Sequence, residues 1–182
     1  LSPRRLTADR AGNAFVQDTW TNSVRRIAPA TGLITAIAGG GTNIPGNGPA
    51  TSMNLGDFSD LVVSDAGKLY LADNTRVFVV DLATGQLALF SGGTNGGFSG
   101  DGGPALAARF DFISGLALAP GGGLLISDTG NQRIRYVVPD SINLTTDSQQ
   151  TAFYLPWVSA LAGDLTIADN PNLTTVDMSG LT

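Results

Sequence analysis

Four aspartates recur along the chain and are the first residues whose type and spacing could do chemistry. Asp18, Asp73 and Asp128 follow one another at intervals of 55 residues, and Asp169 comes 41 residues later. Carboxylates can act as general acids or bases, and they can bind hard cations such as calcium. Each of these aspartates ends an apolar segment and opens a turn, where its side chain can accept hydrogen bonds from nearby backbone N–H groups. We therefore expect them to be structural turn anchors, because a residue that recurs in every repeat usually stabilises the repeat.

The missing residue types narrow the possible chemistry further. The 182 residues include no cysteine and no histidine. Disulfides, thiolate zinc sites and cysteine nucleophiles are therefore excluded, and the commonest general base is absent. A Ser-His-Asp triad cannot form within this chain. We expect no catalytic residues and no cofactor, and we interpret the chain as non-enzymatic.

A few further residues are candidates for specific sites. Asp101 lies in a glycine-rich segment and is a weak candidate for a calcium ligand, although no Asp-x-Asp-x-Asp array surrounds it. Asn143 and Asn172 each begin an Asn-x-Thr sequon, which accepts N-linked glycans if the chain passes through a secretory pathway. Arg133 follows the turn that Asp128 opens, and we count it among the turn anchors because the two side chains could pair across that turn.

The chain carries unusually little charge. Only 14% of its residues are charged, one of them is the single lysine, and the net charge is −5. Binding to nucleic acid is not expected, because it needs clustered lysine and arginine. No apolar run approaches the ~18 residues that a membrane-spanning segment needs. The uncharged polar surface favours an extracellular or cell-surface location.

An internal repeat must position these side chains. Ala-Thr-Gly occurs at 30–32 and 83–85, Gly-Gly-Thr-Asn at 40–43 and 92–95, and Gly-Pro-Ala at 48–50 and 103–105. Within a repeat, short apolar runs alternate with turn residues, which predicts antiparallel strands. In the third repeat we expect strands at 115–118, 124–127 and 133–138, and a fourth strand at 142–146 that matches 33–38 and 86–91 in the earlier repeats.

Four strands per repeat of about 40–50 residues is the pattern of a β-propeller blade. We predict an all-β fold and a single propeller region over residues 1–182. The blades are expected at about 1–55, 56–110, 111–155 and 156–182, and the last of these is incomplete.

The pattern Leu-Ala-x-x-x-x-Gly-x-Leu-x-Ile-x-Asp-Thr-x-Asn-x-Arg-Ile-Arg at 116–135 resembles an NHL repeat. The glycine-rich segment 97–105 is similar to a connector found between such repeats in many bacterial and extracellular NHL proteins. The resemblance implies a propeller of NHL-like four-stranded blades, of which this family usually has six. The chain holds about three to four, so a partial or composite propeller is expected.

These observations favour a non-catalytic binding or assembly scaffold. The expected partners are proteins or further copies of the chain, bound through propeller faces and open strand edges, because unpaired edges recruit other strands. Such a chain would be part of an extracellular or cell-surface protein or of a filament, and glycans are possible partners. Two alternatives remain: a calcium-dependent lactonase or hydrolase of the propeller type, and an intracellular NHL propeller that recruits proteins.

Overall fold

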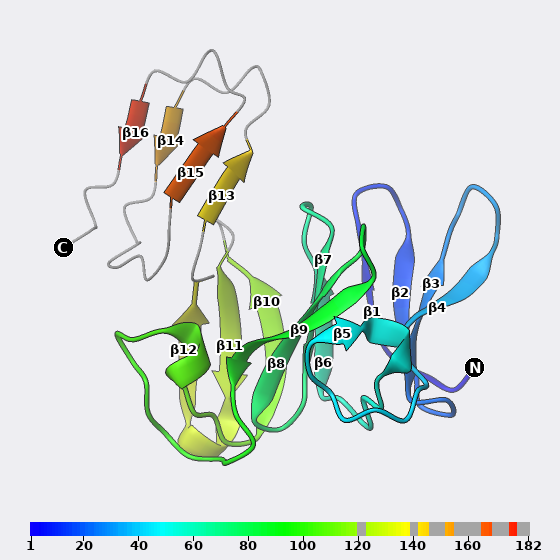
Figure 1. Ribbon diagram of the computed structural model, residues 1–182, viewed down its shortest axis with the longest axis horizontal. Helices are drawn as coiled ribbons and strands as arrows, with labels where there is room; N and C mark the ends of the chain where they lie inside the picture. Colours follow the sequence, from blue (N-terminus) through cyan, green and yellow to red (C-terminus); the bar gives the residue numbers. More distant parts are fainter. Residues whose placement is uncertain (120–122, 139–141, 146–151, 155–164, 169–174, 178–182) are drawn as a thin grey trace.

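A computed structural model describes residues 1–119 and 123–138, together with the strand segments 142–145, 152–154, 165–168 and 175–177. The described part of the chain is built from β-strands and three short 3-10 turns, as the sequence predicts. Two complete four-stranded blades and a three-stranded blade lie side by side (Figure 1). The chain is therefore an all-β partial propeller.

The first blade is an antiparallel sheet in the order β1-β2-β3-β4. Its strands are separated by turns that the sequence marks with glycine, aspartate and asparagine. In the first turn, the backbone N–H of Asn13 donates to the Asp9 carboxylate at 2.8 Å, and Gly12 has a φ of 81° that favours glycine. The strands span Pro3–Ala8, Ala14–Asp18, Ser23–Ile27 and Ile34–Gly39.

The second blade repeats this arrangement and gains a short additional strand. Its strands β6 to β9 span Asp60–Val63, Lys68–Ala72, Arg76–Asp81 and Gln86–Gly92. The additional strand β5, Gly48–Pro49, belongs to the connector from the first blade and pairs with the outer strand β9. The repeated Gly-Pro-Ala elements introduce matching 3-10 turns, η1 at Ala50–Ser52 and η2 at Ala105–Ala107.

The third blade has three described strands, and the predicted strand at 142–146 does form but does not belong to this blade. β10 (Ile113–Leu118), β11 (Leu124–Asp128) and β12 (Arg133–Val137) form an antiparallel sheet, with the 3-10 turn η3 (Thr129–Asn131) between the last two. The expected outer strand, β13 (Ile142–Thr145), pairs with β15 (Leu165–Ala168) instead. That pairing is parallel, whereas every pair of neighbouring strands within the blades is antiparallel.

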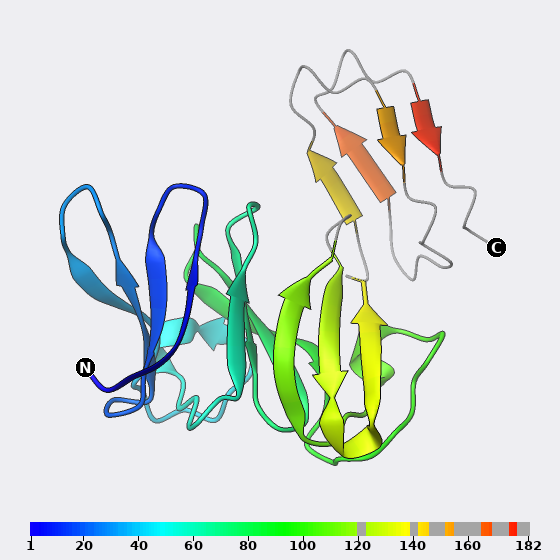
Figure 2. The same cartoon turned by 180° about the vertical axis from the view of Figure 1, so that it is seen from behind.

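The strands after the third blade share a regular offset. β14 (Ala152–Tyr154) pairs with β16 (Thr175–Asp177), again in parallel. Every residue pair in both ladders joins positions 23 residues apart. A constant offset in two parallel ladders is typical of stacked coils, and it differs from the incomplete antiparallel blade that we expect at 156–182. Figures 1 and 2 show these strands beyond one end of the third blade.

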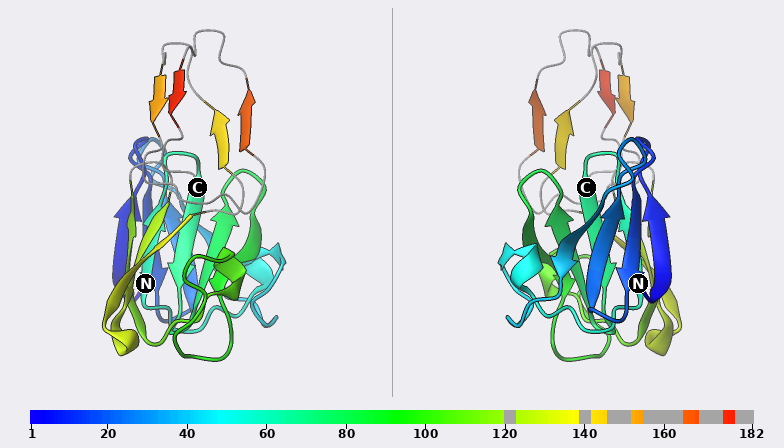
Figure 3. Two further views of the ribbon diagram at one scale, coloured as in Figure 1. Left: turned by 90° about the vertical axis from the view of Figure 1, so that its left-hand side faces the viewer. Right: turned by 90° about the vertical axis from the view of Figure 1, so that its right-hand side faces the viewer.

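The hydrophobic core lies between the blades, in two clusters. One cluster joins the first and second blades and includes Phe15, Leu69 and Leu87, each at most 1% exposed. The other joins the second and third blades around Phe110 and Ile126, which are fully buried. The innermost strand β6 lies between β1 and β10 and contacts both. The side views in Figure 3 show the three blades one behind another, with the strands that follow them beyond one end. Each blade is therefore stabilised mainly by its neighbours.

Candidate functional site

Asp18 lies at the end of β2 and only 2% of its side chain is exposed. One carboxylate oxygen accepts from the backbone N–H groups of Ser2 at 3.0 Å and Trp20 at 3.3 Å. The other accepts from the Thr21 hydroxyl at 2.9 Å and from Nε of Arg25 at 3.3 Å. The Ser2 N–H, followed by the Thr21 hydroxyl, lowers the pKa of the Asp18 carboxyl from its ordinary 3.8 to about 2.

Asp73 occupies the matching position directly after β7. Its Oδ1 accepts from the backbone N–H groups of Thr75 at 2.9 Å and Arg76 at 2.7 Å. Its Oδ2 accepts from Nε of Arg76 at 2.8 Å. The carboxylates of the first two blades therefore bind the turn that follows them and an arginine of the next strand.

Asp128 is fully buried and binds a different set of groups. Its carboxylate accepts from the backbone N–H of Asp111 at 2.8 Å and from Nδ2 of Asn131 at 2.9 Å. It also pairs with Arg135, whose guanidinium lies 3.2 Å away. Arg133, the partner that the sequence suggests, instead donates to the carbonyl oxygen of Asn131 at 2.7 Å. The third carboxylate therefore connects the turn to the connector that precedes its blade.

Arg135 is the centre of this arrangement and is 7% exposed. Its guanidinium donates to two connector carbonyls, pairs with two carboxylates and lies 5.0 Å from two ring centroids. The carbonyls are those of Arg109 and Ser99. The carboxylates are those of Asp128 and Asp101. The rings are those of Phe98 and Phe110. The contacts fix the connector against the third blade. Because Asp101 already faces a buried cation, its carboxylate is poorly placed to bind calcium.

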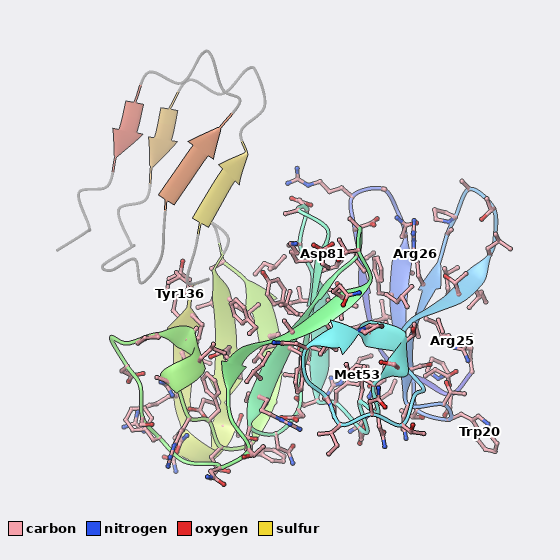
Figure 4. All side chains as sticks on the ribbon, in the orientation of Figure 1. Trp20, Arg25, Arg26, Met53, Asp81 and Tyr136 are labelled. Atoms are coloured by element: carbon pink, nitrogen blue, oxygen red, sulfur yellow. The ribbon has the colours of Figure 1, made fainter. Side chains whose placement is uncertain are left out.

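The single lysine also has a carboxylate partner. Nζ of Lys68 lies 2.6 Å from Oδ2 of Asp81, across neighbouring strands of the second blade. The other oxygen of Asp81 accepts from the backbone N–H groups of Ala83 and Thr84. The Lys68 ammonium is the main cause that lowers the pKa of the Asp81 carboxyl to about 2. Figure 4 shows Asp81 on the second blade.

A polar cluster lies where the first two inner strands meet. Arg4 on β1 pairs with Asp57 at 2.6 Å, and Nε2 of Gln17 donates to Asp57 at 3.1 Å and to the carbonyl oxygen of Phe58 at 3.0 Å. Gln17 is 1% exposed, and its Oε1 is a buried acceptor that has no partner among the described residues. Arg4 and Asp57 are themselves exposed, so this cluster offers polar groups near the innermost strands.

A pocket of about 330 Å³ lies between the end of β9 and η2. At the matching place in the first connector, Gly41 packs against the backbone of Ser52. The second connector has three more residues between its Gly-Gly-Thr-Asn and Gly-Pro-Ala elements, and its Ser99 pairs with Arg109 instead. Most of the residues that line the pocket are small: they are Gly92, Gly93, Thr94, Asn95, Leu106, Ala107, Ala108 and Arg109.

Each blade has two faces. We call the face toward the following blade the leading face and the face toward the preceding blade the trailing face. The leading face of the third blade exposes Ile134 by 67% and Leu125 by 37%. The trailing face of the first blade exposes Leu6 by 74% and Ile34 by 49%. The chain therefore presents apolar side chains on the two outermost blade faces.

The remaining predicted site residues lie in the C-terminal part of the chain. Asn143 is within β13, and Asp169 and Asn172 are outside the described residues. In the described ranges no three His, Cys, Asp or Glu side chains gather as metal ligands. No helix in these ranges is long and apolar enough to cross a membrane.

Sequence reasoning missed the role of Arg135, the pocket and the two apolar faces. The alternation Arg133-Ile134-Arg135 places both arginines on one face of β12 and Ile134 on the other, so a signal for Arg135 was present. The pocket depends on a contact between connector segments, which no local pattern encodes.

Comparisons with known proteins agree with the propeller fold. No family model matches the chain. A curated protein, Protein SUPPRESSOR OF QUENCHING 1, chloroplastic, of Arabidopsis thaliana, is 27% identical to it over 75% of this chain and 13% of that protein. The chain thus spans only a small part of this relative's length.

Three similar solved structures are β-propeller-like proteins. A structural genomics protein of unknown function from Bacteroides thetaiotaomicron has a TM-score of 0.59 and 20% identity, over 69% of this chain and 32% of that one. An auxiliary nutrient binding protein from Bacteroides ovatus has a TM-score of 0.52 and 16% identity, over 75% of this chain and 34% of that one. A candidate gluconolactonase has a TM-score of 0.50 and 15% identity, over 76% of this chain and 49% of that one. The chain covers half or less of each, so the blades are part of what such a propeller contains.

Proposed function

We propose that this chain is a non-catalytic binding and assembly scaffold that belongs to an extracellular or cell-surface protein with NHL-like blades. The observation that carries the proposal is the pair of exposed apolar faces at the two ends of the blade series. Contiguous apolar surface on a soluble protein usually marks a site of association. The similarity in fold to a nutrient binding protein is consistent with a binding role.

The arrangement of the carboxylates supports a non-catalytic role. The carboxylates of Asp18, Asp73 and Asp128 are all bound by backbone N–H groups and arginines. A general acid or base needs a proton that it can exchange with a substrate, and a calcium site needs several free oxygen ligands. Carboxylates whose oxygens already accept these hydrogen bonds are better suited to stabilise the blade than to exchange protons or bind calcium.

The competing function is a calcium-dependent lactonase, which the similarity in fold to a candidate gluconolactonase favours. The polar cluster of Arg4, Asp57 and Gln17 near the inner strands would be its place. The test is hydrolysis of gluconolactone by the purified chain with added calcium and with a chelator, together with the melting temperature in both conditions. We expect no hydrolysis above the uncatalysed rate and no shift in melting temperature. Calcium-dependent turnover that is lost in Asp57→Asn would overturn the scaffold proposal.

The two sequons extend the proposal to a glycosylated surface protein. Asn143 and Asn172 are the acceptor sites. Expression through a eukaryotic secretory pathway, followed by mass measurement before and after glycosidase treatment, should show a mass loss that is absent in Asn143→Gln combined with Asn172→Gln. An unchanged mass would contradict this part.

A further inference from the structure

The exposed leading face of the third blade is made of positions that are buried in the second blade. Leu125 on β11 corresponds to Tyr70 on β7, 55 residues earlier, and Ile134 on β12 corresponds to Val77 on β8 by strand register. Tyr70 is 6% exposed and Val77 is fully buried, because both pack against the third blade. The residue types at these positions are therefore those of a blade interface, although the structure leaves them exposed.

The trailing face of the first blade shows the same relation to the second blade. Leu6 on β1 corresponds to Leu61 on β6, and Ile34 on β4 corresponds to Leu87 on β9. Leu61 is 4% exposed and Leu87 is 1% exposed, because both belong to the cluster between the first two blades. This face too has the composition of an interface.

The two exposed faces are complementary in kind. Inside the chain, a leading face always packs against a trailing face. Phe15 and Leu69 share the first cluster, and Tyr70 and Leu124 hold the corresponding positions in the second cluster. Leu125 holds the position of Phe15 and Tyr70 on the leading face of the third blade. Its partner would be a residue that holds the position of Leu69 and Leu124 on a trailing face, and in the first blade that residue is Ala14. The chain's own first blade has this trailing face, but it lies on the far side of the second blade (Figure 1).

Within the described residues, the strands that follow the third blade do not extend its sheet. β13 to β16 pair with one another in parallel, and none of them joins a described strand of the blades. The three blades also correspond to about half of a similar propeller chain, since the aligned region covers 49% of the candidate gluconolactonase. Two copies of this chain would therefore supply about as many blades as one such chain.

We propose that a second copy of this chain covers both apolar faces at once. The third blade of each copy packs on the first blade of the other, so that six blades form one closed ring with two equivalent interfaces. Contacts of this head-to-tail kind produce rings where the rotation closes. A different partner would need one surface that fits the leading face of the third blade and another that fits the trailing face of the first blade. A second copy of the chain has both surfaces. This inference rests on the scaffold function proposed above and names its partner.

Sedimentation velocity of the purified 182-residue chain, over a wide range of concentration, tests the proposal. We expect a dimer as the largest species. Ile134→Asp or Leu6→Asp places an unpaired carboxylate in both interfaces of the ring and should weaken the dimer roughly 100-fold. Trp20→Asp is the matched control, because Trp20 is 85% exposed in a turn outside the two faces, and it should leave the dimer unchanged. Circular dichroism of each variant shows whether the blades remain folded.

The absence of cysteine allows a test of orientation. Chains with Leu125→Cys and chains with Ala14→Cys are mixed and treated with a bismaleimide whose span is about 10 Å, the usual spacing of stacked sheets. A head-to-tail ring should give cross-linked dimers that contain one chain of each kind. Dimers of two Leu125→Cys chains would overturn the proposal, because they indicate that like faces meet.

The outcomes also separate this proposal from the function on which it rests. A monomer at all concentrations, or growth into polymers longer than a dimer, would overturn the closed ring. A monomer without lactonase activity would leave a scaffold for a different partner, and polymers would agree with assembly of another geometry. Only calcium-dependent hydrolysis would overturn the scaffold function itself.

Discussion

Arg135 has more partners than any other side chain described above, and it makes the sharpest prediction for a single residue. Replacing it in Arg135→Met keeps an unbranched side chain but leaves the buried carboxylate of Asp128 without its cation. Removing one partner of a buried ion pair typically costs about 3–5 kcal/mol. We expect a loss of unfolding free energy in this range, measured by urea denaturation.

Arg133→Met is the control for this measurement. Arg133 lies on the same strand and over the ring of Phe98, 4.1 Å from its centroid, but it is exposed. An exposed cation–π contact contributes about 0.5–1 kcal/mol, so the loss should stay near or below 1 kcal/mol. Equal losses in the two variants would contradict the central role of Arg135.

The lowered pKa values of Asp18 and Asp81 predict a loss of stability in acid. Both carboxyls have a pKa of about 2 in the folded chain, below the ordinary value of 3.8. A lowered pKa stabilises the fold at pH values above the ordinary value, and this stabilisation is lost as the pH falls from about 4 through 2. The urea midpoint should therefore drop steeply in this window, and less steeply in Asp81→Asn. An identical slope in the variant would show that Asp81 does not contribute.

Residue roles could be predicted from the sequence only where they depend on local structure. The hydrogen bonds that Asp18 and Asp73 accept from the following turn come from residues two or three positions away, which a turn motif encodes. Asp128 pairs with Arg135 because diagonal neighbours in a sheet are within reach of long side chains. Arg135 also donates to connector carbonyls that are 26 and 36 residues away, which no local pattern encodes, so the sequence alone leaves both arginines open.

At the scale of elements, the connectors predict a contrast between two equivalent glycines. A Cβ on Gly41 would overlap the backbone of Ser52, whereas a Cβ on Gly93 would have no neighbour within 4 Å. Gly41→Ala should cost about 1–3 kcal/mol, because the connector must shift. Gly93→Ala, at the same position of the next repeat, should stay within about 0.5 kcal/mol. Thermal denaturation of both variants measures this, and a neutral Gly41→Ala would contradict the close contact.

Most strands of the blades could be predicted because turn residues separate them at short intervals. The failure at β13 has a simple physical cause. Alternating apolar residues identify a strand but not its partner, and a parallel partner 23 residues away is as compatible with the pattern as an antiparallel one. The regular offset becomes visible only when both ladders are known.

At the scale of the whole molecule, the cores between the blades couple neighbouring sheets. Phe110 is fully buried in the cluster between the second and third blades, whereas Phe112, two residues later, is 57% exposed. Phe110→Ala should cost about 3–5 kcal/mol and destabilise both blades, because each repeat depends on its neighbour. Phe112→Ala is the control and should cost far less. Hydrogen exchange should show faster opening of both β7 and β11 in Phe110→Ala, and an effect confined to one blade would contradict this coupling.

The position of the single lysine within β7 has a practical consequence for proteolysis. A lysine-specific protease has a single cleavage site in this chain, after Lys68. That bond lies in β7, which is paired on both sides by β6 and β8. Proteases need an extended segment free of such pairing, so cleavage requires that the second blade opens. One cut into two fragments would then report directly how often the middle blade of the series comes apart.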